Sequence, residues 1–154
     1  MPARVPRAPV DHENHAVQFY RAEDELAASA GRWFPACLDS AREARRFVLG
    51  QLGSRLDASV AADASIVIAE LAANAVLHAR SAFRVTVSES GGFVRINVAD
   101  AVPLPDGGLV TVPGHGLDVV SKVAVRWAAE PRPDGKAIWA ELPAGPRRRA
   151  GAAD

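Results

Sequence analysis

Three polar side chains recur at intervals of four residues within an otherwise apolar segment, residues 67–79. Glu70, Asn74 and His78 occupy positions i, i+4 and i+8 of the sequence VIAELAANAVLHA. If this segment is helical, the three side chains share one face, because residues four apart lie one above the other. A carboxylate and an amide on one stripe can hold a hard cation and orient a nucleophile beside a phosphate, since Mg²⁺ prefers oxygen ligands. The spacing predicts the outline of an ATP site.

Two helices are expected around this motif. A first helix is predicted to begin at Ser40, which forms a capping box with Glu43, and to end near Gly53. The second begins after Asp57, a suitable N-cap, and carries the motif to about residue 78 or 79. Its buried side is predicted to consist of Val60, Val67, Leu71 and Ala75.

A pair of strands follows the second helix. Residues 83–88 and 93–99 flank Gly91-Gly92, and apolar residues alternate with polar ones along the second segment. This pattern indicates an antiparallel hairpin with one covered face. Residues 101–115 are too irregular and too rich in Pro and Gly to form a regular element.

The last elements are a helix and a second hairpin. Residues 117–123 are typical of a helix, and residues 125–128 and 137–140 are predicted to pair across an Asp-Gly turn. Each of these two strands carries a tryptophan, Trp127 and Trp139. Both are predicted to be core residues, because large aromatic side chains on strands usually pack against helices.

Composition indicates one globular domain. The chain has 154 residues, of which 49% are hydrophobic, enough for one substantial core. Its formal net charge is zero, which argues against recruitment of nucleic acid or anionic membrane by a global field. Cys37 is the only cysteine, so we expect neither an intramolecular disulfide nor a zinc site of several thiolates. With no signal region and no apolar run near the roughly 20 residues of a membrane span, we expect a cytoplasmic protein.

The two ends differ in composition from the centre. Residues 1–12 and 143–154 are rich in proline or arginine, and are predicted to be a disordered leader and a disordered tail. Residues 13–33 form an extension in which a weakly alternating strand, residues 15–20, precedes an Ala- and Glu-rich helical stretch, residues 23–33. The main domain is expected at residues 34–142.

The motif Glu70-x-x-x-Asn74-Ala75-x-x-His78-Ala79 resembles the N box of the GHKL ATPases, the superfamily of gyrase, sensor histidine kinases and mismatch-repair ATPases. The chain looks most like a small single-domain branch, the anti-sigma-factor serine kinases and their actinobacterial regulatory relatives. Their features follow in order from about residue 34 to 142, ending with Asp100, Gly114-x-Gly116-Leu117, Trp127 and Gly135-Lys136-x-x-Trp139. Residues 13–33 resemble the opening of a MEDS-type sensory domain.

The resemblance implies a role for each matching residue. Glu70 would be the general base and Asn74 the Mg²⁺ ligand, while His78 is structural or contacts a lid. Asp100 would accept a hydrogen bond from the adenine amino group, which selects adenine over guanine. The remaining nucleotide-binding candidates are Gly114, His115, Gly116 and Leu117, which match the second glycine box, and Lys136 on the final hairpin.

One segment departs from the family's pattern. The superfamily's fuller motif is Asp-x-Gly-x-Gly, whereas this chain reads Asp100-Ala101-Val102-Pro103-Leu104. Both glycines are missing, and glycines there let the backbone approach the nucleotide. ATP binding and turnover are therefore open at this point.

The resemblance implies an α/β, or α+β, two-layer sandwich with a mixed, mainly antiparallel sheet and helices on one face. It implies an ATP- and Mg²⁺-dependent protein serine/threonine kinase that regulates transcription by binding a sigma factor and phosphorylating a STAS-type antagonist. The alternative is a regulatory interaction module that binds partners with little or no ATP turnover. A sensor histidine kinase fits less well, because the chain lacks a long dimerisation helix pair. Whether the protein is a homodimer is open.

Overall fold

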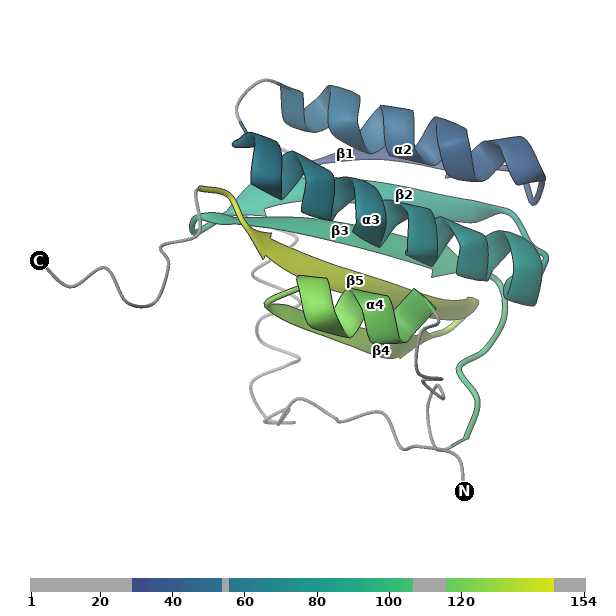
Figure 1. Ribbon diagram of the computed structural model, residues 1–154. Helices are drawn as coiled ribbons and strands as arrows, with labels where there is room; N and C mark the ends of the chain where they lie inside the picture. Colours follow the sequence, from purple (N-terminus) through teal and green to yellow (C-terminus); the bar gives the residue numbers. More distant parts are fainter. Residues whose placement is uncertain (1–28, 54–55, 107–115, 146–154) are drawn as a thin grey trace, which may run out of the picture.

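The computed structural model of the protein describes residues 29–53, 56–106 and 116–145, which form a sheet covered by helices (Figure 1). In chain order the elements are β1 (Ala30–Phe34), α2 (Leu38–Leu52), α3 (Ala58–Asn74), the π-helical turn η2 (Ala75–Ala79), β2 (Phe83–Ser90), β3 (Phe93–Asp100), α4 (Gly116–Val123), β4 (Arg126–Arg132) and β5 (Gly135–Pro143).

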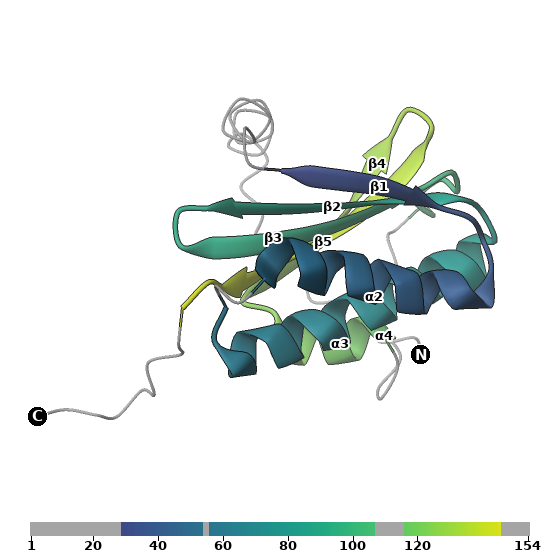
Figure 2. The ribbon, with the colours of Figure 1, turned by 90° about the horizontal axis from the view of Figure 1, so that it is seen from above.

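The sheet has five strands in the order β1-β2-β3-β5-β4. Every pairing between the described strands is antiparallel. Viewed from above, α2, α3 and α4 lie on the same side of the sheet (Figure 2). The predicted fold class, a two-layer α+β sandwich with helices on one face, is confirmed, and within the described residues its sheet is antiparallel throughout.

The core lies between the sheet and the helices. Alternate residues of β3, Val94, Ile96 and Val98, are buried in it, as the period of two in the sequence predicts. The four residues predicted for the buried side of the long helix, Val60, Val67, Leu71 and Ala75, are all buried there. Burying one such aliphatic side chain contributes roughly 1.5–3 kcal/mol, so these two stripes hold α3 against the sheet.

Local turn chemistry fixes the first hairpin. Gly91 and Gly92 have φ values of 58° and 81°, which few residues other than glycine adopt readily. The register that follows pairs Phe83 with Asp100 and Ser90 with Phe93. The hairpin predicted across Gly91-Gly92 is therefore confirmed, and its register brings Asp100 to the end of β3.

The predicted capping box at Ser40 is wrong. Helix α2 begins at Leu38 with Cys37 as its N-cap, and Ser40 lies inside the helix with only 1% of its surface exposed. Its hydroxyl lies 3.2 Å from the Cys37 sulfur. Ser40 begins the stripe that continues through Ala44 and Val48, so its position on the sheet-facing side explains its burial.

The predicted helix over residues 23–33 is wrong where it meets β1. Residues 30–34 are a strand that pairs with β2, from Ala30 opposite Val87 to Phe34 opposite Phe83. Phe34 enters the core and stacks on Phe83 with ring centroids 5.5 Å apart. Tertiary pairing therefore overrides the helical preference of the Ala-rich sequence. The predicted leader and the strand at 15–20 lie outside the described residues.

The predicted tail also begins too early. Pro143 is the last residue of β5, and the Ala144 amide donates to the Gly92 carbonyl at 2.8 Å. The sheet thus includes the start of this segment, and residues 146–154 lie outside the described part of the chain.

Helix α3 and its continuation η2 form a 22-residue stretch, Ala58–Ala79, that is long and apolar enough by length and composition to cross a membrane. The prediction that no apolar run approaches this length is wrong on that measure. Val67, Ile68 and Leu71 in this stretch are buried against the sheet. Core packing therefore accounts for its apolar composition.

Candidate functional site

Glu70 and Asn74 lie on the side of α3 that meets the start of α4. Both are half-buried. A Cβ atom added to Gly116, the first residue of α4, would lie 2.8 Å from Glu70 Oε2 and 3.7 Å from Asn74 Oδ1. The backbone of Gly116 therefore approaches both predicted site residues closely, and a side chain at position 116 would displace the Glu70 carboxylate.

The predicted glycine box, residues 114–117, is described by the structure only in part. The Leu117 side chain is buried in the core, so only its backbone is available to a nucleotide. Gly116 and Leu117 begin α4, and the first amides of a helix have no partner within the helix. Gly114 and His115 lie outside the described residues.

His78 does not join Glu70 and Asn74 as an inward-facing group. The helix changes to π geometry from Ala75 to Ala79, and His78 in this turn is exposed. Arg80 follows in the left-handed conformation with φ of 50° and ends the helical segment. The position of His78 is compatible with the predicted structural or lid role.

Asp100 and Lys136 form a buried ion pair at the end of β3. The two residues are directly opposite in the β3–β5 register. Lys136 Nζ donates to Asp100 Oδ1 at 2.9 Å, and the two side chains are only 9% and 5% exposed. The Val102 amide donates to the same oxygen at 2.9 Å. Two residues predicted separately from the sequence therefore contact each other directly.

The residues after Asp100 are held by further contacts that sequence reasoning missed. The Ala101 amide donates to the Ser81 hydroxyl at 3.2 Å, and Lys136 Nζ approaches the Val102 carbonyl at 3.4 Å. The short segment following β3 is thus tied to the start of β2 and to β5. Ser81 gave no signal in the sequence, because a serine before a strand is common in loops.

Gly135 allows the β4–β5 turn to pack closely on the end of β3. Its φ is 156°, and an added Cβ would lie 1.9 Å from the Asp100 carbonyl oxygen. The β4–β5 turn therefore packs backbone to backbone on the end of β3. This contact requires glycine, which the sequence revealed only as part of a turn.

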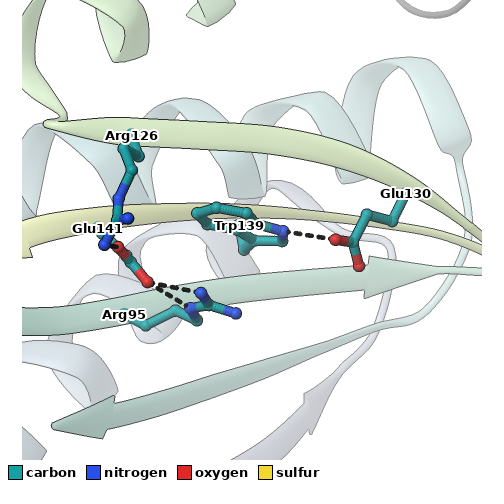
Figure 3. A network of polar contacts seen from close by, with 5 residues as sticks. All are labelled: Arg95, Arg126, Glu130, Trp139 and Glu141. Carbon is teal, nitrogen blue, oxygen red and sulfur yellow. Dashed lines mark hydrogen bonds and ion pairs between the residues drawn. The ribbon is translucent and has the colours of Figure 1, made fainter. Parts of the chain in front are cut away.

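A second polar cluster lies on the sheet face turned away from the helices (Figure 3). Glu141 accepts from Arg95 Nε at 3.0 Å and from Arg126 at 2.6 Å. Arg95 also lies over the Trp139 ring, 4.1 Å from its centroid, and the Trp139 indole donates to Glu130 at 3.0 Å. Trp139 is buried as predicted, but on this face, whereas Trp127 packs against the core.

The predicted site residues gather at one end of the sandwich. Figure 1 shows the C-terminal ends of α3 and β3, the N-terminal end of α4 and the β4–β5 turn at the same end of the molecule. These element ends carry Asn74, Asp100, Gly116 and Lys136. The arrangement offers a carboxylate and an amide beside a helix start, and a second carboxylate held by an ammonium group.

The Asn74 amide oxygen fits a role as a ligand to a magnesium ion that is bound to ATP. Within the described ranges, no three His, Cys, Asp or Glu side chains gather into a site that could hold a metal. Mg²⁺ bound to ATP needs few protein ligands, because it keeps several waters and takes oxygens from the phosphates. Asn74 could supply one amide oxygen, and Gly116 leaves the space beside it free of a side chain.

Comparisons with known proteins bear on the fold. No protein-family model and no curated protein matches the sequence. The structure is similar to the crystal structure of the RsbU and RsbW domains of Rv1364c from Mycobacterium tuberculosis, with a TM-score of 0.56 and 19% sequence identity. The likeness covers 78% of this chain and 34% of that chain.

The chain has an α+β, GHKL-like fold. This likeness confirms the fold that the N-box resemblance implies. The sheet order and the helical layer described above agree with it. The chain spans about a third of the length of the similar structure. At 19% identity the likeness concerns the fold alone, so activity and partners have to be argued from this chain's own residues.

Proposed function

We propose that this GHKL domain is an ATP- and Mg²⁺-dependent protein serine/threonine kinase of the anti-sigma-factor type, acting in the cytoplasm. The observation that carries the proposal is the close approach of Gly116 to Glu70 and Asn74. This approach brings the Glu70 carboxylate, the Asn74 amide and the N-terminus of α4 together, and such groups can hold the phosphates of a nucleotide and their metal ion.

Each residue has a distinct task in this proposal. Asn74 holds Mg²⁺, and the amides at the start of α4 bind phosphate oxygens. When bound, Mg²⁺ neutralises charge on the phosphates. Glu70 accepts the proton of the attacking serine or threonine hydroxyl. The hydroxyl oxygen forms a bond to the γ-phosphorus, the bond between the γ-phosphorus and its bridging oxygen breaks, and ADP leaves.

Asp100 recognises the base. An ionised carboxylate only accepts hydrogen bonds, so it suits the adenine amino group and disfavours the carbonyl that guanine carries at that position. Among the described residues, the donors to this carboxylate both use Oδ1. A carboxylate has two oxygens and about four acceptor positions, which leaves Oδ2 for the base.

The proposed partners are a sigma factor and a STAS-type antagonist that carries the phosphorylated serine or threonine. Support comes from the sequence resemblance to the anti-sigma kinases and from the fold likeness to a structure whose name includes an RsbW domain. A zero net charge fits regulation through protein partners instead of nucleic acid.

A second candidate is a regulatory interaction module with little or no ATP turnover. It is favoured by Val102 and Leu104, which stand where the superfamily has glycines, and by the half-buried Val102 next to Asp100. Side chains there narrow the space in which a backbone can approach a nucleotide.

Calorimetry with Mg²⁺-ATP, Mg²⁺-GTP and metal-free ATP distinguishes the two candidates. The kinase proposal expects Mg²⁺-dependent preference for ATP, loss of the metal dependence in Asn74→Ala and loss of the base preference in Asp100→Ala. No binding at millimolar ATP, a regime near about −4 kcal/mol, would contradict it.

Phosphate transfer is the second part of this test. A STAS-domain protein, if one is encoded beside this chain's gene, is the substrate to test, and transfer is followed with γ-labelled ATP. Glu70→Gln should lower the transfer rate by roughly 10²-fold to 10⁴-fold while ATP binding persists. Equal transfer by the two proteins would remove Glu70 from its proposed role.

A further inference from the structure

The buried pair between Asp100 and Lys136 carries an inference that rests on the proposed function and deepens it. We propose that Lys136 is a positioning residue that sets the base preference of the nucleotide site. It does so by fixing which oxygen of the Asp100 carboxylate faces the base.

The pair is nearly removed from solvent. Lys136 Nζ lies 2.9 Å from Asp100 Oδ1, and the side chains are 9% and 5% exposed. A buried carboxylate is costly unless it is paired with a counter-charge and hydrogen-bonded. The ammonium group of Lys136 supplies that counter-charge to Asp100.

The orientation of the Asp100 carboxylate decides how well it selects the base. A carboxylate oxygen that faces the base accepts from the adenine amino group and disfavours the carbonyl of guanine. Loss of Lys136 would let the carboxylate turn and would weaken this selection. Lys136 thus acts on base choice without any contact of its own with the nucleotide.

Lys136 also fixes the orientation of the carboxylate. Its Nζ and the Val102 amide both donate to Oδ1, and Nζ lies 3.4 Å from the Val102 carbonyl. Among the described residues, these donors occupy one oxygen and leave Oδ2 for a ligand. The lysine joins β5 to the end of β3 and to the segment that follows it.

The backbone beneath Lys136 leaves little freedom. A Cβ added to the preceding residue, Gly135, would lie 1.9 Å from the Asp100 carbonyl oxygen, so the β4–β5 turn is packed directly on β3. The position of the ammonium group is therefore set by two strands in register, since Asp100 and Lys136 are direct cross-strand partners.

Base selectivity measured on the full chain tests this proposal. Calorimetry compares Mg²⁺-ATP, Mg²⁺-GTP and the Mg²⁺ complex of purine riboside triphosphate, which has no group at the 6-position. Lys136→Met should lower the ATP-to-GTP affinity ratio by roughly tenfold or more and change purine riboside triphosphate binding much less. Lys136→Arg, which keeps the charge, should retain most of the ratio.

Two controls separate positioning from a merely structural role. Lys122→Met removes an exposed lysine on α4 that pairs with Asp118, and it should leave all three affinities unchanged. In an Asp100→Asn background, Lys136→Met should have no further effect on the ratio, because the carboxylate that Lys136 holds is already absent. If Lys136→Met does not fold, Lys136→Gln makes the same comparison.

The outcomes are distinguishable. An unchanged ATP-to-GTP ratio in Lys136→Met or Lys136→Gln, or an equal loss for all three nucleotides, overturns the role of Lys136 while the proposed kinase function stands. Failure of the native chain to bind any of the three nucleotides overturns the proposed function and the role of Lys136 together.

Discussion

The β3–β5 ladder carries two cross-strand ion pairs of opposite polarity, and they lie on opposite faces of the sheet. At one end, the acidic residue Asp100 on β3 pairs with the basic residue Lys136 on β5. Further along, the basic residue Arg95 on β3 pairs with the acidic residue Glu141 on β5. Asp100 follows the alternation of the core residues of β3, whereas Arg95 lies between two of them in sequence.

The two pairs differ in how they are supported. Both partners of the Asp100–Lys136 pair are nearly buried, at 5% and 9% exposure, and each is the other's charged partner. Glu141 is 8% exposed but is shared by two arginines, Arg95 and Arg126, that are 32% and 55% exposed. Among the described residues, the first pair has no substitute when one member is lost, whereas the second can lose an arginine and keep the carboxylate paired.

This difference indicates two uses of the same ladder. The Asp100–Lys136 pair lies at a strand end, beside a segment that leads toward α4 and the Gly116 contact. The Arg95–Glu141–Arg126 cluster lies on the face without helices and joins three strands through Trp139 and its neighbours (Figure 3). We therefore expect the first to affect nucleotide binding and the second to affect stability alone.

The largest effect is expected from breaking the first pair. Lys136→Met leaves Asp100 buried without its counter-charge and should lower the free energy of unfolding by about 3–5 kcal/mol. Replacing both partners, as in Lys136→Met with Asp100→Leu, should recover most of that loss, because two apolar groups leave no unpaired charge. Urea unfolding of the two single variants and the double variant measures the coupling. Additive losses would contradict a one-to-one buried pair.

The next prediction concerns Gly116, which links the nucleotide end to α3. Gly116→Ala should displace the Glu70 carboxylate from its position and lower phosphate transfer by roughly 10²-fold, since a shift of about 1 Å in a catalytic group has effects of that size. Gly50→Ala in α2 is the matched control, because a Cβ there meets nothing within 4 Å. It should leave transfer unchanged and stabilise the helix by about 0.5–1 kcal/mol. Equal transfer rates in the two variants would argue against the Gly116 contact.

Glu141→Gln tests the second cluster. It removes the charge that both arginines share and should cost about 1.5–3 kcal/mol in the free energy of unfolding, the range for hydrogen bonds to charged groups. The affinity for Mg²⁺-ATP should stay within twofold of the native value, because Glu141 lies on the sheet face opposite the core. A marked loss of ATP affinity in a folded Glu141→Gln protein would remove the distinction between the two regions.

The sequence predicted those parts of the fold that local signals determine. The Gly91-Gly92 turn and the N-box helix with its Val60, Val67 and Leu71 stripe are found where expected, and the final hairpin is found with both strands longer than predicted. Strand β1 was missed, because Ala30–Phe34 becomes a strand only through pairing with β2, which lies far along the chain. Residue composition favoured a helix there, and no local pattern reports an edge pairing.

The sequence identified residues of the candidate site, but it could not show which of them contact one another. Glu70 and Asn74 followed from helical spacing, but their contact with Gly116 depends on how α4 packs on α3. Lys136 and Asp100 are 36 positions apart, and their pairing depends on β5 lying next to β3 in register. Likewise, the alternation around Trp139 could not indicate its face, because β5 is buried along almost its whole length.

The smallest effect is expected at the exposed edge of the second cluster. Arg126 is 55% exposed, on edge strand β4, and Glu141 keeps its bond to Arg95 when Arg126 is removed. Arg126→Ala should therefore change the free energy of unfolding by less than about 1 kcal/mol, and less still at high salt, as for other exposed ion pairs. Arg95→Ala should cost more, because Arg95 also covers the Trp139 ring at 4.1 Å. Urea unfolding at low and high salt compares the two variants, and a larger, salt-independent loss in Arg126→Ala would show that the edge strand, instead of the Trp139 stack, holds this cluster together.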